Sequence, residues 1–136
     1  APRIVAGEGA HPDAHTVVRV FDRYGALETQ FLAYPATVSG GVRVCAGALL
    51  GGGTKIVATP IADASFREIR IFHQDGRLAG AFEPPAEIAA PFLIAVADFH
   101  PDYPGEEIAV APARSAPGET AIALFDGAGT ELLRRA

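Results

Sequence analysis

The 136-residue sequence contains no asparagine, methionine or tryptophan and has only one cysteine. Without asparagine there is no acceptor for N-linked glycosylation. The single cysteine, Cys45, excludes an internal disulfide, and its small apolar neighbours predict a buried side chain rather than a reactive thiol. The longest apolar run, Phe92 to Ala97, is far too short to cross a bilayer. We recognise no signal or transit sequence.

Clustered positive charge is missing too. Eleven Lys and Arg residues against sixteen Asp and Glu residues give a formal net charge of -5, and only Arg134 and Arg135 are adjacent. A nucleic-acid-binding surface needs basic residues gathered on one face, so nucleic acid is not an expected partner. Hydrophobic residues make up 49% of the chain and charged residues 20%, a composition that predicts a packed globular core.

Helical periodicity is absent, because 15 glycines and 11 prolines interrupt every apolar stripe. Instead, short runs of Val, Ile, Leu, Phe and Ala alternate with Gly, Pro or Asp turns, which is the pattern of β-strands. The predicted strands lie near Arg3–Gly7, Thr16–Asp22, Glu28–Tyr34, Gly41–Leu49, Thr54–Thr59, Arg67–His73, Ala79–Pro84, Pro91–Phe99, Glu106–Pro112, Thr120–Asp126 and Glu131–Ala136.

The strands recur with a period of about 50 residues, which indicates an internal repeat. The repeat is carried by an isoleucine (Ile4, Ile56, Ile108), a phenylalanine (Phe21, Phe72, Phe125) and a turn glycine (Gly25, Gly76, Gly129), always in this order. A second phenylalanine closes the first two units at Phe31 and Phe82, where the third unit has Arg135. We expect Phe21, Phe72 and Phe125 to be equivalent core residues that pack between neighbouring units.

Four strands per unit predict an all-β, β-propeller-like fold built of four-stranded antiparallel blades, with about three blades in this chain. Residues 1–136 then form a single repeat domain, with an incomplete blade at 1–40 and blades at 41–90 and 91–136. The small, apolar first strand of each unit is expected to line the central channel. A β-sandwich is the alternative fold; it explains the alternation of apolar and polar residues but not the repeat.

Two stretches carry a resemblance to a known family. They read V-V-R-V-F-D-R-Y-G-A-L-E-T-Q-F-L-A-Y from Val17 and I-R-I-F-H-Q-D-G-R-L-A-G-A-F from Ile69, the latter preceded by G-G-V-R-V-C-A-G-A-L-L-G-G-G-T-K-I-V-A-T. The sequence resembles the FG-GAP type repeat of integrin alpha subunits and bacterial surface propellers, over nearly the whole chain. The resemblance implies a propeller used as a binding platform, placed outside the cell or on its surface.

The resemblance also implies a calcium loop between the first two strands of a unit. The third unit keeps a degenerate version in which Asp98, Asp102 and Glu106 supply oxygens, the ligands that Ca²⁺ prefers. His100 stands where another carboxylate is expected, and the corresponding loop of the second unit, residues 48–53, has no carboxylate. A solvated acidic turn without metal is the alternative interpretation. No other cofactor is expected.

Three further sequence features are candidate binding sites, and each can also be explained by local structure alone. His11-Pro12-Asp13-Ala14-His15 brings together two imidazoles and a carboxylate, a set that a transition metal accepts, although exposed loops are commonly polar. His73 is predicted to be the polar start of a turn. The glycines at 51–53 predict a hairpin turn rather than a phosphate loop, because no Lys-Ser/Thr pair follows them.

No catalytic residue is assigned, since Ser39, Ser65 and Ser115 lack the glycines of a nucleophile elbow. We expect a non-enzymatic binding, adhesion or assembly module that presents the loops 8–16, 60–66 and 113–119 to a protein or surface polymer. A carbohydrate-binding, lectin-like propeller is the alternative, and a polysaccharide-acting enzyme is a third. Three units leave a propeller ring open, so further blades or a second copy of the chain are expected partners.

Overall fold

The computed structural model describes residues 2–49, 53–114 and 121–135, and all regular structure in these ranges is β-strand. The strands are β1 (Arg3–Gly7), β2 (Val17–Asp22), β3 (Leu27–Leu32), β4 (Val42–Ala48), β5 (Thr54–Pro60), β6 (Ile69–His73), β7 (Leu78–Phe82), β8 (Phe92–Ala97), β9 (Glu107–Pro112), β10 (Ile122–Phe125) and β11 (Glu131–Arg135). Every predicted strand is present, with ends displaced by at most two residues, as for Arg67–His73 against Ile69–His73. The predicted strand ends at Thr120 and Ala136 lie outside the described residues. Within those residues there is no helix that could span a membrane.

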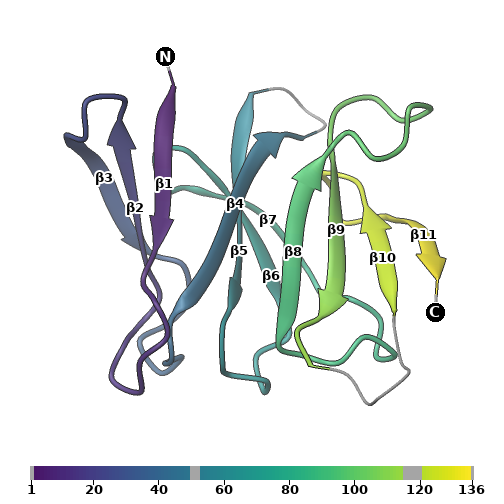
Figure 1. Cartoon of the computed structure of the whole chain (residues 1–136), viewed down its shortest axis with the longest axis horizontal. Helices are drawn as coiled ribbons and strands as arrows, with labels where there is room; N and C mark the ends of the chain where they lie inside the picture. The colour runs from purple at the N-terminus through teal and green to yellow at the C-terminus, as the bar shows by residue number, and fades with distance from the viewer. Residues whose placement is uncertain (1, 50–52, 115–120, 136) are drawn as a thin grey trace.

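The strands form three antiparallel sheets that follow one another along the chain (Figure 1). The first sheet has the order β1-β2-β3, the middle sheet β4-β5-β6-β7 and the third sheet β8-β9-β10-β11. Within each sheet, strands that follow one another in the sequence pair side by side, whereas the chain passes to a new sheet between β3 and β4 and between β7 and β8. The all-β prediction is confirmed.

The three sheets share one pairing register. Ile4 faces Phe21 in the first sheet, Ile56 faces Phe72 in the middle sheet, and Ile108 faces Phe125 in the third. In each sheet the ladder toward the last strand shifts at this phenylalanine. The landmarks that define the sequence repeat therefore occupy corresponding positions in space.

The turn after this phenylalanine is built alike in each sheet. The carbonyl oxygen of His73 accepts a hydrogen bond from the N–H of Gly76 (3.0 Å), and Asp22 and Asp126 bond the N–H groups of Gly25 and Gly129 in the same way. All three glycines have a positive φ, between 84° and 95°, which other residues adopt only with strain. His73 is thus the polar start of a turn, as predicted.

Two hydrophobic layers join the sheets. The layer between the first and middle sheets contains Val18, Val20, Ala33, Tyr34, Val38, Val42, Ile56, Ala58 and Phe72. The layer between the middle and third sheets contains Leu49, Val57, Ile69, Ile71, Ile88, Phe92, Ile108, Val110, Ala123 and Phe125. The middle sheet packs both of its faces against another sheet, whereas each outer sheet packs against another sheet only with the face toward the middle one.

A pair of phenylalanine rings crosses each of these layers. Phe31 of the first sheet contacts Phe72 of the middle sheet at 4.9 Å between ring centroids, and Phe82 contacts Phe125 of the third sheet at 4.7 Å. Phe72 and Phe125 are buried as predicted. Phe21 is only half-buried in this structure, because it lies on the face of the first sheet that points away from the middle sheet.

The first strands of the middle and third sheets, β4 and β8, run side by side (Figure 1). A β-carbon on Gly47 of β4 would collide with the Val96 side chain of β8, so this approach requires glycine. Cys45, also on β4, is half-buried against the core of the middle and third sheets. Burial raises the pKa of its thiol to about 12, so the unreactive protonated form dominates at neutral pH.

Candidate functional site

A polar groove lies at the seam between the first and middle sheets. It encloses about 460 Å³ and is lined by Arg3, Val20, Glu28, Thr29, Gly53, Thr54, Lys55, His73, Gln74, Asp75 and Arg77. These residues come from β1, β2 and β3 of the first sheet and from β5, the residue before it, β6 and the turn between β6 and β7 of the middle sheet, so the groove lies where the two sheets meet. Specificity on repeat scaffolds is often carried by surfaces of this kind.

Arg3 links the two sides of the groove. Its Nε lies 2.6 Å from Glu28 Oε1 within the first sheet, and its Nη1 donates to Gln74 Oε1 of the middle sheet at 2.9 Å. The amide of Gln74 in turn donates to the Thr54 carbonyl at 3.4 Å. Both members of the Arg3–Glu28 pair are more than one-third exposed, so the pair orients polar groups rather than adding much stability.

The turn between β6 and β7 contributes an ion pair on the other side. Arg77 Nε lies 2.8 Å from Asp75 Oδ2, and the Arg77 N–H donates to Asp75 Oδ1 at 3.0 Å. The backbone N–H and then the guanidinium of Arg77 lower the pKa of Asp75, so this carboxylate is ionised at neutral pH. Together with Lys55, the residues that line the groove offer positively charged hydrogen-bond donors and negatively charged acceptors. It suits a polar, extended ligand held by several weak contacts.

The three predicted calcium ligands have different surroundings in this structure. Asp98 and Asp102 are exposed, whereas Glu106 Oε1 accepts the Ala48 N–H at 2.7 Å, and the Glu106 N–H donates back to the Ala48 carbonyl at 2.8 Å. Glu106 thereby fastens the β8–β9 loop to the end of β4. In the part of the chain that is described, no three or more His, Cys, Asp or Glu side chains are grouped to hold a metal. Calcium at Asp98, Asp102 and Glu106 and the metal-free acidic turn both stay predictions.

Glu107, the first residue of β9, is a buried carboxylate that the sequence pattern did not indicate. It is 1% exposed, its Oε1 accepts the His100 N–H at 2.6 Å, and its Oε2 has no hydrogen-bond partner. The sequence around Glu107 does not indicate that its side chain is buried, because this burial depends on the loop that carries His100.

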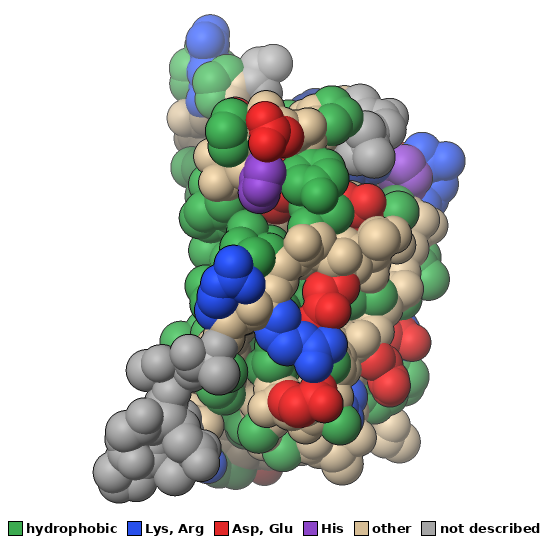
Figure 2. Space-filling view, turned by 90° about the vertical axis from the view of Figure 1, so that its right-hand side faces the viewer, with side chains coloured by type: hydrophobic (Ala, Val, Ile, Leu, Met, Phe, Trp, Pro, Cys, Tyr) green, Lys and Arg blue, Asp and Glu red, His purple; other side chains and the backbone are tan. Residues whose placement is uncertain are grey.

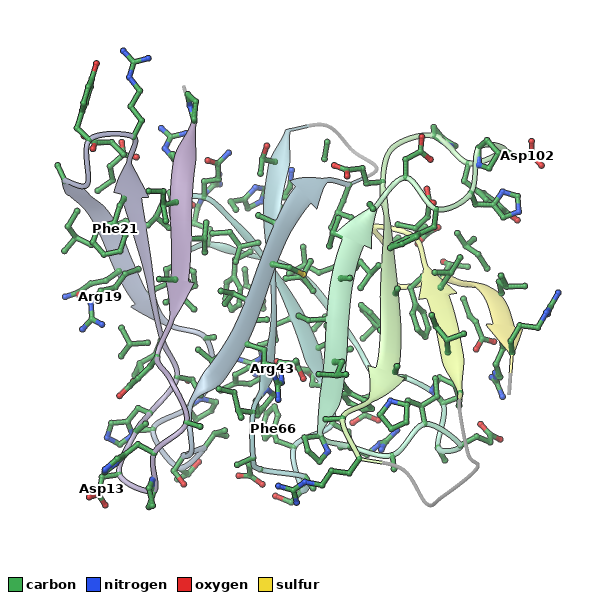
Figure 3. All side chains as sticks on the ribbon, in the orientation of Figure 1. Asp13, Arg19, Phe21, Arg43, Phe66 and Asp102 are labelled. Carbon is green, nitrogen blue, oxygen red and sulfur yellow. The ribbon has the colours of Figure 1, made fainter. Side chains whose placement is uncertain are left out.

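The two His-Pro-Asp sequences form the same local turn at opposite ends of the molecule, where Figure 3 labels Asp13 and Asp102. The Nδ1 atom of His11 accepts the Asp13 N–H at 3.1 Å, and that of His100 accepts the Asp102 N–H at 3.3 Å. One ring nitrogen of each histidine is therefore engaged in its own turn. This explains the spacing around His11 without a metal.

Other predicted features are only partly described. Gly51, Gly52, Ser115 and positions 115–119 of the loop 113–119 lie outside the described residues. Comparison with protein-family models, curated proteins and solved structures gives no match for this chain.

We expect calcium to leave the stability of the chain unchanged. A preformed site occupied at one hundred times its dissociation constant would add about 2.7 kcal/mol and raise the Tm by several degrees. The measurement is the Tm in millimolar calcium and in chelator, where we expect coincident curves. A rise in calcium that the Asp98→Ala variant abolishes would mean that the loop rearranges into a site.

Proposed function

We propose that this chain is a propeller-type module in which each sheet is one blade. Three observations support the proposal: the common register of the sheets, their packing in series, and the approach of β4 and β8 at Gly47. A sandwich has two sheets that face each other, which accounts poorly for a middle sheet that buries both faces. The resemblance to FG-GAP repeats agrees with this arrangement.

The function we propose is non-enzymatic binding or adhesion, with the groove between the first and middle sheets as the contact site. The observation that carries it is the bridge from Arg3 to Glu28 and Gln74, which presents polar groups of two blades to one ligand. The ligand class is a polar segment of a protein or a surface polymer. A location outside the cell is proposed from the resemblance alone.

The lectin-like alternative has less support. Sugar sites commonly pair carboxylates with an aromatic ring that covers the sugar face. The residues that line the groove include no Phe, Tyr or Trp. Tyr34 is buried instead, with its hydroxyl 2.8 Å from the Ala58 carbonyl and 2.6 Å from the Glu68 carbonyl.

The test is a binding screen with groove variants. A phage-displayed peptide library and a panel of neutral and anionic polysaccharides are the probes, and every hit is measured again with Lys55→Glu, Arg77→Glu and Arg23→Glu. Arg23 is the matched control, because it is exposed but does not line the groove. We expect each groove variant to weaken binding about fivefold or more, as for the loss of one charged contact, and the control to bind normally. Hits that bind all three variants as well as the parent would contradict the groove as the site.

A further inference from the structure

Among the described residues, packing in series leaves one face of each outer sheet without a neighbouring sheet. In the first sheet, Val18 and Val20 point into the layer with the middle sheet, so the side chains at the alternating positions point away from it. We call the face that these side chains form the leading face. This leading face consists of Ile4, Val17, Arg19, Phe21, Gln30 and Leu32. In the third sheet, Ile108, Val110 and Phe125 point toward the middle sheet. The opposite, trailing face consists of Leu93, Ile122, Leu124, Leu133 and Arg135; Leu124 is already buried within the chain, and the other four are exposed or partly exposed.

Both faces expose large apolar side chains among charged ones. Ile4 and Leu32 on the leading face are 55% and 48% exposed, and Leu93 and Ile122 on the trailing face are each 44% exposed. Figure 3 shows Arg19 and Phe21 on the side of the first sheet away from the other sheets. Figure 2 views the molecule from the end of the third sheet, where hydrophobic side chains lie between basic and acidic ones.

The chain itself shows what covers such faces. The leading face of the middle sheet packs on the trailing face of the first, and the leading face of the third sheet packs on the trailing face of the middle one. Because the sheets share one register, the two open faces correspond to surfaces that already fit each other twice. We propose that the leading face of one copy binds the trailing face of a second copy, head to tail.

One substitution in the repeat makes this contact specific. Where Phe31 and Phe82 meet the next sheet, the third sheet has Arg135, paired with Ile122 on the trailing face. Its counterpart across the contact is Phe21 of the other copy. The Arg135 guanidinium lies over the Phe21 ring, an attractive cation–π arrangement. The chain already uses this chemistry, since the guanidinium of Arg67 lies 5.2 Å from the Phe92 ring centre.

The leading face also has room for this side chain. At Gly76 and Gly129, an added β-carbon would lie within 3.0 Å of Phe31 and Phe82, so these glycines are in contact with the preceding sheet. The equivalent Gly25 has nothing within 4 Å of that position. The space that a preceding sheet fills in the two internal layers is open at Gly25, next to Phe21.

The number of copies rests on the proposed propeller arrangement. A head-to-tail contact continues until the ring closes. Propellers close with about four to eight blades, and six is the only multiple of three in this range. Two copies therefore make one ring with two identical contacts.

The contact is tested first by sedimentation of four variants. Arg135→Glu and Phe21→Asp should weaken the dimer about tenfold or more, because each removes the stacked pair. Arg135→Phe recreates the ring pair of the internal layers and should tighten it. Leu78→Asp is the control: this residue is an exposed large hydrophobic side chain but belongs to the middle sheet, and its dimer should keep the parent affinity. Equal affinity in all four variants would overturn the proposal.

Cross-linking then tests the direction of the contact. Chains carrying Phe21→Cys and Arg135→Cys are mixed and treated with a short bismaleimide, while Cys45 remains largely unreactive. We expect dimers in the mixture and none with either chain alone. Cross-links within one variant, or none in the mixture, would overturn a head-to-tail contact. Failure here leaves ligand binding unaffected, because the polar groove lies within one chain, so the two proposals can fail separately.

Discussion

Replacing Phe72 by alanine should lower the free energy of unfolding by about 3–5 kcal/mol, the usual loss when a buried phenylalanine is truncated. Phe72 is buried in the layer between the first and middle sheets, where its ring centroid lies 4.9 Å from that of Phe31. Its loss leaves a cavity bounded by rigid strands on both sides, which cannot easily collapse. Urea unfolding followed by circular dichroism measures the change.

Alanine variants of two other phenylalanines serve as comparisons for this prediction. Phe99 lies after β8 with almost half of its side chain exposed, so Phe99→Ala should cost less than about 1 kcal/mol. Phe21→Ala should fall between the two, because its ring is only half-buried in one chain. If all three variants had the same free energy of unfolding as the parent, the alignment of the repeats in space would be wrong.

Gly47→Ala should destabilise the chain by about 1–3 kcal/mol, as expected when a methyl group is forced into a filled space. A β-carbon at this position would collide with Val96 of β8 and lie 3.0 Å from Glu106 Oε1. Either β4 and β8 separate, or the Glu106 bond to Ala48 is disturbed. Thermal and urea unfolding of the variant report the loss.

Gly80→Ala is the matched comparison, since Gly80 also lies within a strand and has no atom within 4 Å of an added β-carbon. Alanine there should be neutral or stabilise the strand by up to about 1 kcal/mol, because glycine loses more backbone entropy on folding. Equal effects at Gly47 and Gly80 would mean that the first strands of the sheets do not approach closely.

The strands could be predicted because their signals are local. Turn glycines such as Gly76 and alternating runs such as β6 are visible within a few residues, and they set the pairing of neighbours. The spacing of Ile4, Ile56 and Ile108 also predicted which positions correspond between the sheets, since residues that recur in a repeat take equivalent places in each sheet.

The groove and the role of Glu106 could not be predicted in this way. Arg3 and Gln74 are 71 positions apart, and Glu106 meets Ala48 from the next sheet, so neither contact leaves a local pattern. The acidic spacing around Glu106 pointed to calcium, whereas the structure uses that carboxylate to hold a backbone N–H. Carboxylate spacing alone does not distinguish a metal ligand from a residue that fastens a loop.

The most direct test of the account is the molar mass of the unmodified chain, measured by light scattering over a micromolar concentration series. If three blades pair head to tail with a second set, the mass should rise to twice the 14.1 kDa of the chain and stop there, because a six-bladed ring leaves no face open. A mass of 14.1 kDa that stays constant up to high micromolar concentration would contradict the open three-blade arrangement.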